Sequence, residues 1–337
     1  MPALSSADHG TSPPTLSIPR EYNAAHDLLE RNLGAGRAAR IAYIDDRGSY
    51  TYGDLAGRVA RCANALTALG LEMEQRVLIC MLDTIDWPTA FLGCIAAGIV
   101  PVAVNTLLRT ADYEYMLRDS RARALIVSAP LLPTVAPLIG KVPSLKHLIV
   151  AGPEHGEHLN FSKLLAQAEP RFEPARTLAD DMCFWLYSSG STGAPKGTVH
   201  VHSSLIQTAE LYGRAVLGIR EDDVVFSAAK LFFAYGLGNA LSFPLWVGAT
   251  TVLMAERPTP DAVFARLRQH QPTIFYGVPT LYAALLASSN LPARGALRMR
   301  ACVSAGEALP REIGERWQRH FGVEILDGIG SAEMFHI

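Results

Sequence analysis

The stretch YSSGSTGAPKG, residues 187–197, directly follows a short apolar run. Its three glycines let the backbone turn and come close to a ligand. Its four Ser and Thr hydroxyls and several backbone N–H groups can donate hydrogen bonds to phosphate oxygens, and Lys196 adds a mobile positive charge. No Gly-Lys-Ser/Thr step ends the stretch, so it is not a Walker loop. It predicts a phosphate-binding loop at the end of a strand; a flexible surface loop of turn-forming residues is the alternative.

Short continuous apolar runs alternate with helical patterns on both sides of this loop. The runs lie at 77–81, 99–104, 124–127, 147–150, 183–187, 250–254, 273–276, 301–304 and 323–326. The clearest helices lie after Thr51, which can form a capping box with Asp54, and at 203–216, 260–267, 280–286 and 310–321. Such runs are typical of buried parallel strands joined by crossover helices. The pattern predicts an α/β fold with two packed lobes of mostly parallel sheets flanked by helices.

The chain length also favours two lobes. A chain of 337 residues is longer than one simple hydrophobic core normally serves. We expect one lobe over about 75–225 and a second lobe built from about 21–72 plus 228–337. Residues 1–20 are rich in Ser, Pro and Thr and lack the basic start and apolar run of a signal peptide, so we expect a loose segment there.

The composition excludes several classes of protein. Apolar residues make up 49% and charged residues 18%, which is ordinary for a soluble globular chain. The net charge of -2 leaves no basic surplus for a nucleic-acid partner. The longest apolar stretch, 91–104, is too short to span a bilayer, and the five scattered cysteines have no metal-ligand spacing. We therefore expect a cytoplasmic protein with buried, reduced thiols, no membrane span and no nucleic-acid partner.

The loop resembles the phosphate loop of the adenylate-forming enzymes, which include acyl-CoA synthetases, firefly-type luciferases and the adenylation domains of peptide synthetases. Their loop reads Ser/Thr-Ser-Gly-Ser/Thr-Thr-Gly-x-Pro-Lys-Gly, and residues 188–197 match it at every position. Four further stretches follow the family's order, namely SYTYGDL at 49–55, AGIVP at 97–101, SAGEALP at 304–310 and DGIGSAE at 327–333. The resemblance covers 21–337 and implies the fold of the family's N-terminal domain.

The resemblance also implies a reaction with two halves. A carboxylate attacks the α-phosphate of ATP and expels pyrophosphate, and the thiol of CoA then attacks the acyl-adenylate. Lys196 and Glu333 are the implied catalytic residues, with Glu333 as the ligand of a Mg²⁺ ion that bridges the phosphates. The implied ATP-binding residues are Ser188, Ser189, Gly190, Ser191, Thr192, Gly193, Lys196, Gly197, Ser304, Ala305, Gly306, Glu307, Asp327, Gly328, Ile329, Gly330, Ser331 and Ala332.

The acid that is activated is predicted from three stretches. KLFFAYGLGN at 230–239, YGVPT at 276–280 and EMFHI at 333–337 are most similar to the corresponding stretches of benzoate-CoA ligases. A flat ring needs a flat apolar slot with few polar groups. The expected lining is Ala234, Tyr235, Gly236, Tyr276, Gly330 and His336. Simple core packing of these aromatic residues and of His336 is the alternative, and His200 and His202 are expected to be structural.

Two positions depart from the family's pattern. Ala332 stands where the family has a Thr whose hydroxyl contacts the α-phosphate, and Ile329 stands where an aromatic residue often stacks on adenine. The chain ends at Ile337, before the C-terminal lid domain of the family. We therefore expect an incomplete N-terminal adenylation domain that needs that C-terminal domain for full activity and by itself binds nucleotide weakly and turns over poorly.

Other functions stay open. An aliphatic acid-CoA ligase and a non-catalytic nucleotide-binding remnant both fit the loop. An amino-acid adenylating domain fits less well, because Ala234, Tyr235 and Gly236 offer no carboxylate for a substrate ammonium group. A luciferase-like oxygenase is disfavoured still more.

Overall fold

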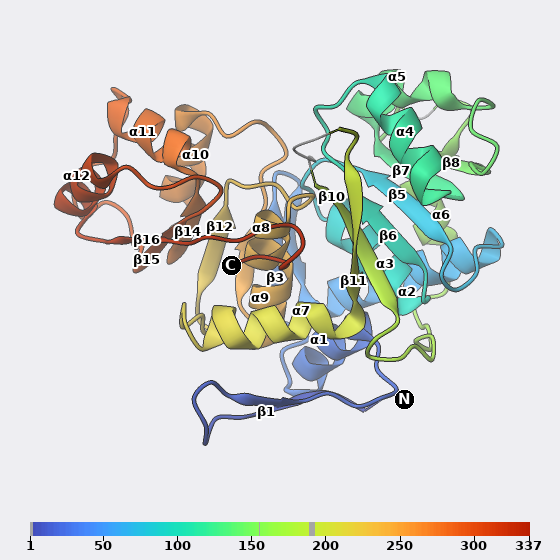
Figure 1. Cartoon of the computed structure of the whole chain (residues 1–337), viewed down its shortest axis with the longest axis horizontal. Coiled ribbons are helices and arrows are strands. Elements are labelled where there is room, and N and C mark those ends of the chain that lie inside the picture. The colour runs from blue at the N-terminus through green and yellow to red at the C-terminus, as the bar shows by residue number, and fades with distance from the viewer. Residues whose placement is uncertain (1–2, 155, 189–192) are drawn as a thin grey trace.

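A computed structural model describes residues 3–154, 156–188 and 193–337. Two seven-stranded sheets stand side by side, with helices on their outer faces and between them (Figure 1). This arrangement confirms the predicted α/β fold with two lobes. The C-terminus lies between the two sheets, beside a short helix of the second lobe (Figure 1).

The first sheet has the strand order β11-β10-β6-β5-β7-β8-β9. Its strands are β5 (Arg76–Cys80), β6 (Val100–Ala103), β7 (Ala124–Ser128), β8 (His147–Ala151), β9 (Leu159–Asn160), β10 (Met182–Ser188) and β11 (Lys196–Val201). All neighbours are parallel except β10 and β11, which form an antiparallel pair. Strand β11 was not predicted from the sequence, which placed only a loop and a helix after 187.

The second sheet has the strand order β16-β15-β14-β12-β13-β3-β4. Its strands are β3 (Ile41–Asp45), β4 (Gly48–Thr51), β12 (Val224–Ser227), β13 (Thr250–Val252), β14 (Ile274–Gly277), β15 (Ala301–Ser304) and β16 (Ile325–Asp327). Only the β3–β4 pair is antiparallel. Because β12 belongs to this sheet, the second lobe begins slightly before the expected residue 228.

The helices match most of the expected segments. They are α1 (Ala24–Gly34), α2 (Tyr52–Ala68), α3 (Asp86–Ala96), α4 (Thr110–Ser120), α5 (Leu132–Val135), α6 (Phe161–Gln167), α7 (His202–Thr208), α8 (Ala234–Leu237), α9 (Phe243–Val247), α10 (Pro260–His270), α11 (Pro279–Ala287) and α12 (Arg311–Phe321). Two π-helical turns, η3 (Ala209–Arg214) and η4 (Gly238–Ser242), follow α7 and α8, and 3₁₀ turns lie at Ala129–Leu131 and Ala136–Leu138. The predicted capping box of Thr51 and Asp54 starts α2.

Both faces of each sheet are buried, which explains the continuous apolar runs. In β5, Val77 and Ile79 face a core that lies between the sheets, whereas Leu78 and Cys80 face a second core under α4 and α5. The second sheet alternates in the same way between the central core and a third core under α10–α12. All five cysteines are free and buried, as expected. Within the described ranges, every helix is too short or too polar to cross a membrane.

The N-terminal segment, expected to be loose, carries a hairpin in the structure. Strands β1 (Ser6–Asp8) and β2 (Thr15–Ser17) pair with each other. The segment also contacts α1, where the buried carboxylate of Asp27 accepts hydrogen bonds from the hydroxyls of Ser5 at 2.5 Å and Tyr22 at 2.7 Å. Apolar patterning could not reveal this contact because it is made by polar groups.

A buried carboxylate joins the two lobes. Asp86, at the start of α3 in the first lobe, accepts hydrogen bonds from Arg47 of the β3–β4 turn at 2.9 Å and from Arg58 of α2 at 2.5 Å. The side chain of Asp86 is 5% exposed. Next to it, Asp45 of the second sheet accepts a hydrogen bond from the backbone N–H of Ile85 at 2.9 Å. These contacts fix how the lobes lie against each other.

Replacing Asp86 is therefore expected to weaken the contact between the lobes. Asp86→Ala removes the closest acidic partner of two partly buried guanidinium groups, and we expect the free energy of unfolding to fall by roughly 2–3 kcal/mol, less than for a fully buried pair because both arginines reach solvent and Arg47 keeps its contact with Asp45. Urea denaturation measures this change. The control Asp222→Ala removes a carboxylate that is 80% exposed and is expected to change stability by less than about 0.5 kcal/mol. Equal losses in the two variants would contradict the structural role of Asp86.

Candidate active site

The carboxyl ends of the parallel strands of both sheets open into one cavity of about 950 Å³. Its lining comes from the segments that follow β5, β6, β12, β13, β14, β15 and β16, and from the β10–β11 hairpin. Ligands of α/β proteins bind in this position, where loops diverge from the strand ends. The cavity is large enough for a nucleotide and a small acid together.

The predicted phosphate loop joins two antiparallel strands. Ser188 ends β10 and pairs with Lys196, which begins β11, so the two strands form an antiparallel hairpin. Both residues line the cavity, and the Lys196 side chain is exposed. Four predicted ATP-binding residues, Ser189, Gly190, Ser191 and Thr192, lie outside the described residues. Gly193 is exposed, and Gly197 lies against the Trp185 ring rather than in the cavity lining.

Glu333 faces this hairpin from the other lobe. Hydrogen bonding from its own backbone N–H and from the hydroxyls of Ser331 and Ser188 lowers the pKa of Glu333. The carboxylate is therefore ionised at neutral pH, and it lines the same cavity as Lys196. Lys196 and Glu333, which the sequence predicts at one site, therefore line a single cleft. The Ser188 hydroxyl, at the end of β10 in the first lobe, contacts Glu333 of the second lobe.

His200 ties the Glu333 segment to the hairpin. Its Nε2 donates a hydrogen bond to the backbone carbonyl of Ala332 at 2.7 Å, and its ring stacks on Phe184 of β10. Burial lowers the pKa of His200. His202 lies further away and accepts a hydrogen bond from the backbone N–H of Ala24 at 3.1 Å, so both histidines have structural roles. The sequence did not show which segment His200 holds.

The other predicted ATP-binding residues divide into two groups. Those that line the cavity are Ala305, Gly306, Gly330, Ser331 and Ala332. Those that lie beside it without lining it are Ser304, Glu307, Asp327, Gly328 and Ile329. The Asp327 carboxylate accepts a hydrogen bond from the backbone N–H of Leu309 at 3.0 Å and so holds the 305–309 loop, whereas the Ile329 side chain is 90% exposed.

The expected acid slot is only partly formed by the expected residues. Ala234, Tyr235, Gly330 and His336 line the cavity. Tyr276 is fully buried behind Tyr235, with ring centroids 6.3 Å apart, so it supports the wall instead of forming its surface. Gly236 does not line the cavity either. It is needed because a Cβ atom there would overlap the backbone carbonyl of Lys230.

Three charged residues at the site were not selected from the sequence: Lys230 and Arg257 line the cavity, and Asp83 does not. Lys230 lines the cavity and donates hydrogen bonds to the backbone carbonyls of Met254 and Glu256. Asp83, after β5, is buried and accepts a hydrogen bond from the backbone N–H of Leu231 at 3.2 Å. Burial raises the pKa of Asp83 to about 6, against the opposing effect of Lys230. Its place after an apolar strand was the one signal that could have identified Asp83.

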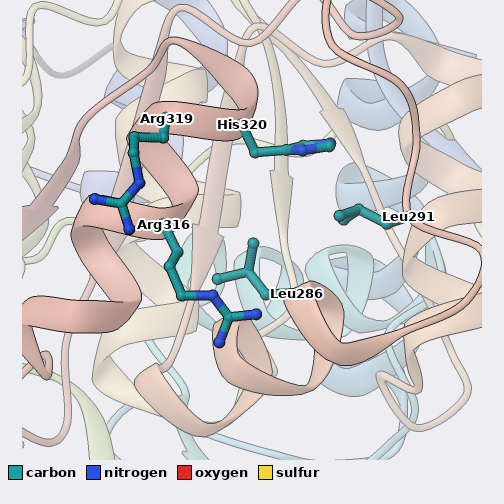
Figure 2. A pocket seen from close by; sticks show the side chains of 5 residues that line it. All are labelled: Leu286, Leu291, Arg316, Arg319 and His320. Atoms are coloured by element: carbon teal, nitrogen blue, oxygen red, sulfur yellow. The ribbon is translucent and has the colours of Figure 1, made fainter.

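A second, smaller cavity of about 310 Å³ lies between α11 and α12 (Figure 2). It is lined by Leu286, Leu291, Arg316, Arg319 and His320. None of the predicted site residues borders it, and it is remote from the carboxyl ends of the strands. The Nε2 atom of His320 is already hydrogen-bonded to the Pro292 carbonyl at 2.8 Å. We therefore place the chemistry in the large cavity.

Comparison with known proteins agrees with this geometry. Residues 29–337 match the family model of the AMP-binding enzymes. The chain belongs to this family. The matched range includes every strand of both seven-stranded sheets and every segment that lines the large cavity.

Several AMP-binding enzymes are similar over almost the whole chain. The benzoate–CoA ligase of Thauera aromatica is 66% identical over 100% of this chain and 64% of its own length. The 4-hydroxybenzoate–CoA/benzoate–CoA ligase of Rhodopseudomonas palustris is 49% identical over 94% of this chain and 59% of its own length. The crystal structure of a benzoate CoA ligase from Burkholderia xenovorans LB400 superposes with a TM-score of 0.89 at 57% identity, over 94% of this chain and 62% of that one. The chain thus spans about three fifths of the length of these relatives.

Proposed function

We propose that this chain provides the nucleotide and acid sites of an ATP-dependent aromatic acid–CoA ligase. The acid, of the benzoate type, is converted to its acyl-adenylate and then to a CoA thioester. The observation that carries this proposal is the single cavity bordered by Ser188 and Lys196 from one lobe and by Glu333 and His336 from the other. The similar proteins are named as CoA ligases of benzoate and 4-hydroxybenzoate, which supports an aromatic acid as the substrate.

The main difficulty of the first step is the approach of a carboxylate to a polyanion. Lys196 and the hydroxyl of Ser188 would bind phosphate oxygens and offset their charge, and the cavity would hold the carboxylate near the α-phosphate. Small residues line the space between the two ends of the cavity, so no large side chain fills it; they are Ala305, Gly306 and Gly330. The apolar wall with Ala234 and Tyr235 would orient an aromatic ring.

The donor set fits a magnesium ion that is shared with phosphates. Glu333 supplies a hard, ionised oxygen ligand at the cavity wall. Within the described ranges, no group of three or more His, Cys, Asp or Glu side chains could hold a metal ion by itself. One carboxylate together with phosphate oxygens and water is the usual coordination of Mg²⁺ at ATP sites. The ion would neutralise phosphate charge.

Binding of a stable mimic tests this proposal on the chain itself. We expect 5′-O-(N-benzoylsulfamoyl)adenosine, which mimics benzoyl-adenylate, to bind tightly in isothermal titration calorimetry. The hexanoyl analogue is expected to bind at least about ten times more weakly, because it leaves a flat aromatic slot poorly filled. Tighter binding of the hexanoyl compound would favour an aliphatic acid, and binding of neither compound would favour a non-catalytic remnant.

Ala332 allows a test that should increase activity. Ala332 lines the cavity beside Glu333, and we expect a Thr hydroxyl at this position to reach a phosphate. One hydrogen bond to a charged group contributes about 1.5–3 kcal/mol, so Ala332→Thr should raise the rate of adenylate formation about ten- to a hundred-fold. The rate is measured by ATP–pyrophosphate exchange with benzoate, in this chain joined to the C-terminal part of the Thauera relative. An unchanged or lower rate would reject this role of the hydroxyl.

A further inference from the structure

The segment at 230–235 forms one wall of the proposed acid slot. It lies between β12 and α8 in the second lobe and includes the first turn of α8. Five of its six residues line the large cavity, namely Lys230, Phe232, Phe233, Ala234 and Tyr235. Because most of the segment lies outside regular secondary structure, its position depends on the hydrogen bonds that anchor it.

Two of these anchors belong to the second lobe itself. The Lys230 ammonium donates hydrogen bonds to the backbone carbonyls of Met254 and Glu256, which follow β13. The Tyr235 hydroxyl donates a hydrogen bond to the backbone carbonyl of Val303 in β15 at 3.0 Å. Both anchors tie the segment to its own sheet, so neither of them fixes the segment relative to the first lobe.

The third anchor comes from the first lobe. Asp83 follows β5 and is 4% exposed, and its carboxylate accepts a hydrogen bond from the backbone N–H of Leu231 at 3.2 Å. In the part of the chain that the structure describes, this N–H has no other acceptor. The Asp83 segment is itself held within the first lobe, because the Ser128 hydroxyl at the end of β7 accepts a hydrogen bond from the backbone N–H of Leu82 at 2.9 Å.

The charge of Asp83 strengthens this third anchor. Burial raises the pKa of Asp83 to about 6, so its carboxylate is ionised at pH 8. The positive charge of Lys230 opposes this rise and favours the ionised form. A hydrogen bond to an ionised acceptor is roughly twice as strong as one to a neutral acceptor. The Leu231 N–H therefore has a strong acceptor on the opposite lobe.

We propose that Asp83 is a positioning residue that holds the 230–235 wall on the first lobe and so sets the distance between the acid slot and the hairpin with Ser188 and Lys196. Strand β5, which leads to Asp83, and strand β10, which leads to Ser188, lie in the same sheet with β6 between them. The wall and the hairpin are therefore anchored on one sheet. This inference rests on the proposed function, because the distance matters only to a ligand that occupies both ends of the cavity.

The test compares a ligand for both ends of the cavity with a ligand for one end. The benzoyl-adenylate mimic and ATP with Mg²⁺ are each titrated into this 337-residue chain by calorimetry at pH 8. Asp83→Leu has a side chain of the same branching without an acceptor for the Leu231 N–H. A hydrogen bond to a charged group corresponds to a factor of about ten or more in the fraction of time that the wall is in place. We therefore expect Asp83→Leu to weaken binding of the mimic about ten-fold and binding of ATP less than about two-fold.

Asp83→Asn tests whether the hydrogen bond carries this effect. Its amide oxygen still accepts from the Leu231 N–H, although without a charge, so the affinity for the mimic should stay within about three-fold of the unmodified chain. If Asp83→Leu does not fold, replacing Leu231 by its α-hydroxy acid analogue removes only the N–H group and should give the same ten-fold loss.

Asp181→Leu separates a positioning role from a general loss of stability. Asp181 lies just before β10, at the end of the strand away from the cavity, and its carboxylate accepts a hydrogen bond from the backbone N–H of Leu178 at 2.7 Å. Its replacement should leave the ratio of the two affinities unchanged. An unchanged ratio in Asp83→Leu or in the Leu231 analogue, an equal change in Asp181→Leu, or a ten-fold loss in Asp83→Asn would each overturn the inference. Absence of mimic binding by the unmodified chain would instead reject the proposed function.

Discussion

Glu333→Gln is expected to reduce the rate of adenylate formation by roughly 100-fold, which corresponds to about 2.7 kcal/mol of lost transition-state stabilisation. The substitution keeps the size and hydrogen-bonding oxygen of the side chain but removes the charge that would hold Mg²⁺ against the phosphates. The rate is measured by ATP–pyrophosphate exchange with benzoate in the protein joined to the C-terminal part of the Thauera relative. Calorimetry on this chain provides a second measurement, because Mg²⁺ should no longer increase the affinity for ATP.

Glu324→Gln is the matched control for this experiment. Glu324 is an exposed carboxylate just before β16 and does not line the cavity. Its replacement changes the net charge by the same amount, so any general electrostatic effect on ATP binding should appear in both variants. Similar behaviour of the two variants, or a normal effect of Mg²⁺ on ATP affinity in Glu333→Gln, would contradict the metal-binding role.

Gly330→Ala is expected to remove binding of the benzoyl-adenylate mimic almost completely, by 100-fold or more. A Cβ atom at Gly330 would overlap the backbone carbonyl oxygen of His336, and a backbone carbonyl cannot move aside as a flexible side chain can. The bridge between Ser331 and His336 closes the turn that carries Glu333, so displacing it moves Glu333 and the cavity wall at His336 together. Affinity is measured by calorimetry, and the unfolding free energy should fall by about 1–3 kcal/mol, as for other overpacked sites.

Gly57→Ala is the matched control, because it makes the same substitution at a position with space for a Cβ atom. A Cβ atom at Gly57, in α2, would meet no heavy atom within 4 Å. Alanine is favoured over glycine inside a helix, so this variant should be stabilised by about 0.5–1 kcal/mol and should bind the mimic normally. If Gly330→Ala binds as well as Gly57→Ala, the turn at 330–336 does not organise the cavity.

Much of the fold could be predicted because it depends on local patterns. The run at 77–81 is apolar at every position, and each of its counterparts has at most two polar residues, as expected of strands buried on both faces. Thr51 and Asp54 start α2 as their spacing predicts. The antiparallel strand β11 was missed because its alternating, partly exposed residues lie among turn formers and do not form an apolar run.

The site was predicted less completely. Residue chemistry at fixed spacing, together with the resemblance, predicted that the loop at 187–197 and Glu333 share one site, and the structure places Ser188, Lys196 and Glu333 around one cavity. The same approach placed Tyr276 and Gly236 in the slot, although packing puts both behind its surface. Sequence spacing indicates which side chains are near a site, but it does not indicate which of them reach the cavity.

The layered α/β architecture and the position of the loop that we propose binds phosphate follow from local sequence patterns, because periodicity and glycine-rich turns act over short segments. How the groups at the cleft are held depends on contacts between segments that are far apart in the sequence. His200 meets the carbonyl of Ala332 across 132 residues, and Asn239 meets His336 across 97. Such contacts depend on how two sheets and their loops pack against each other, and no local pattern in either segment encodes its partner.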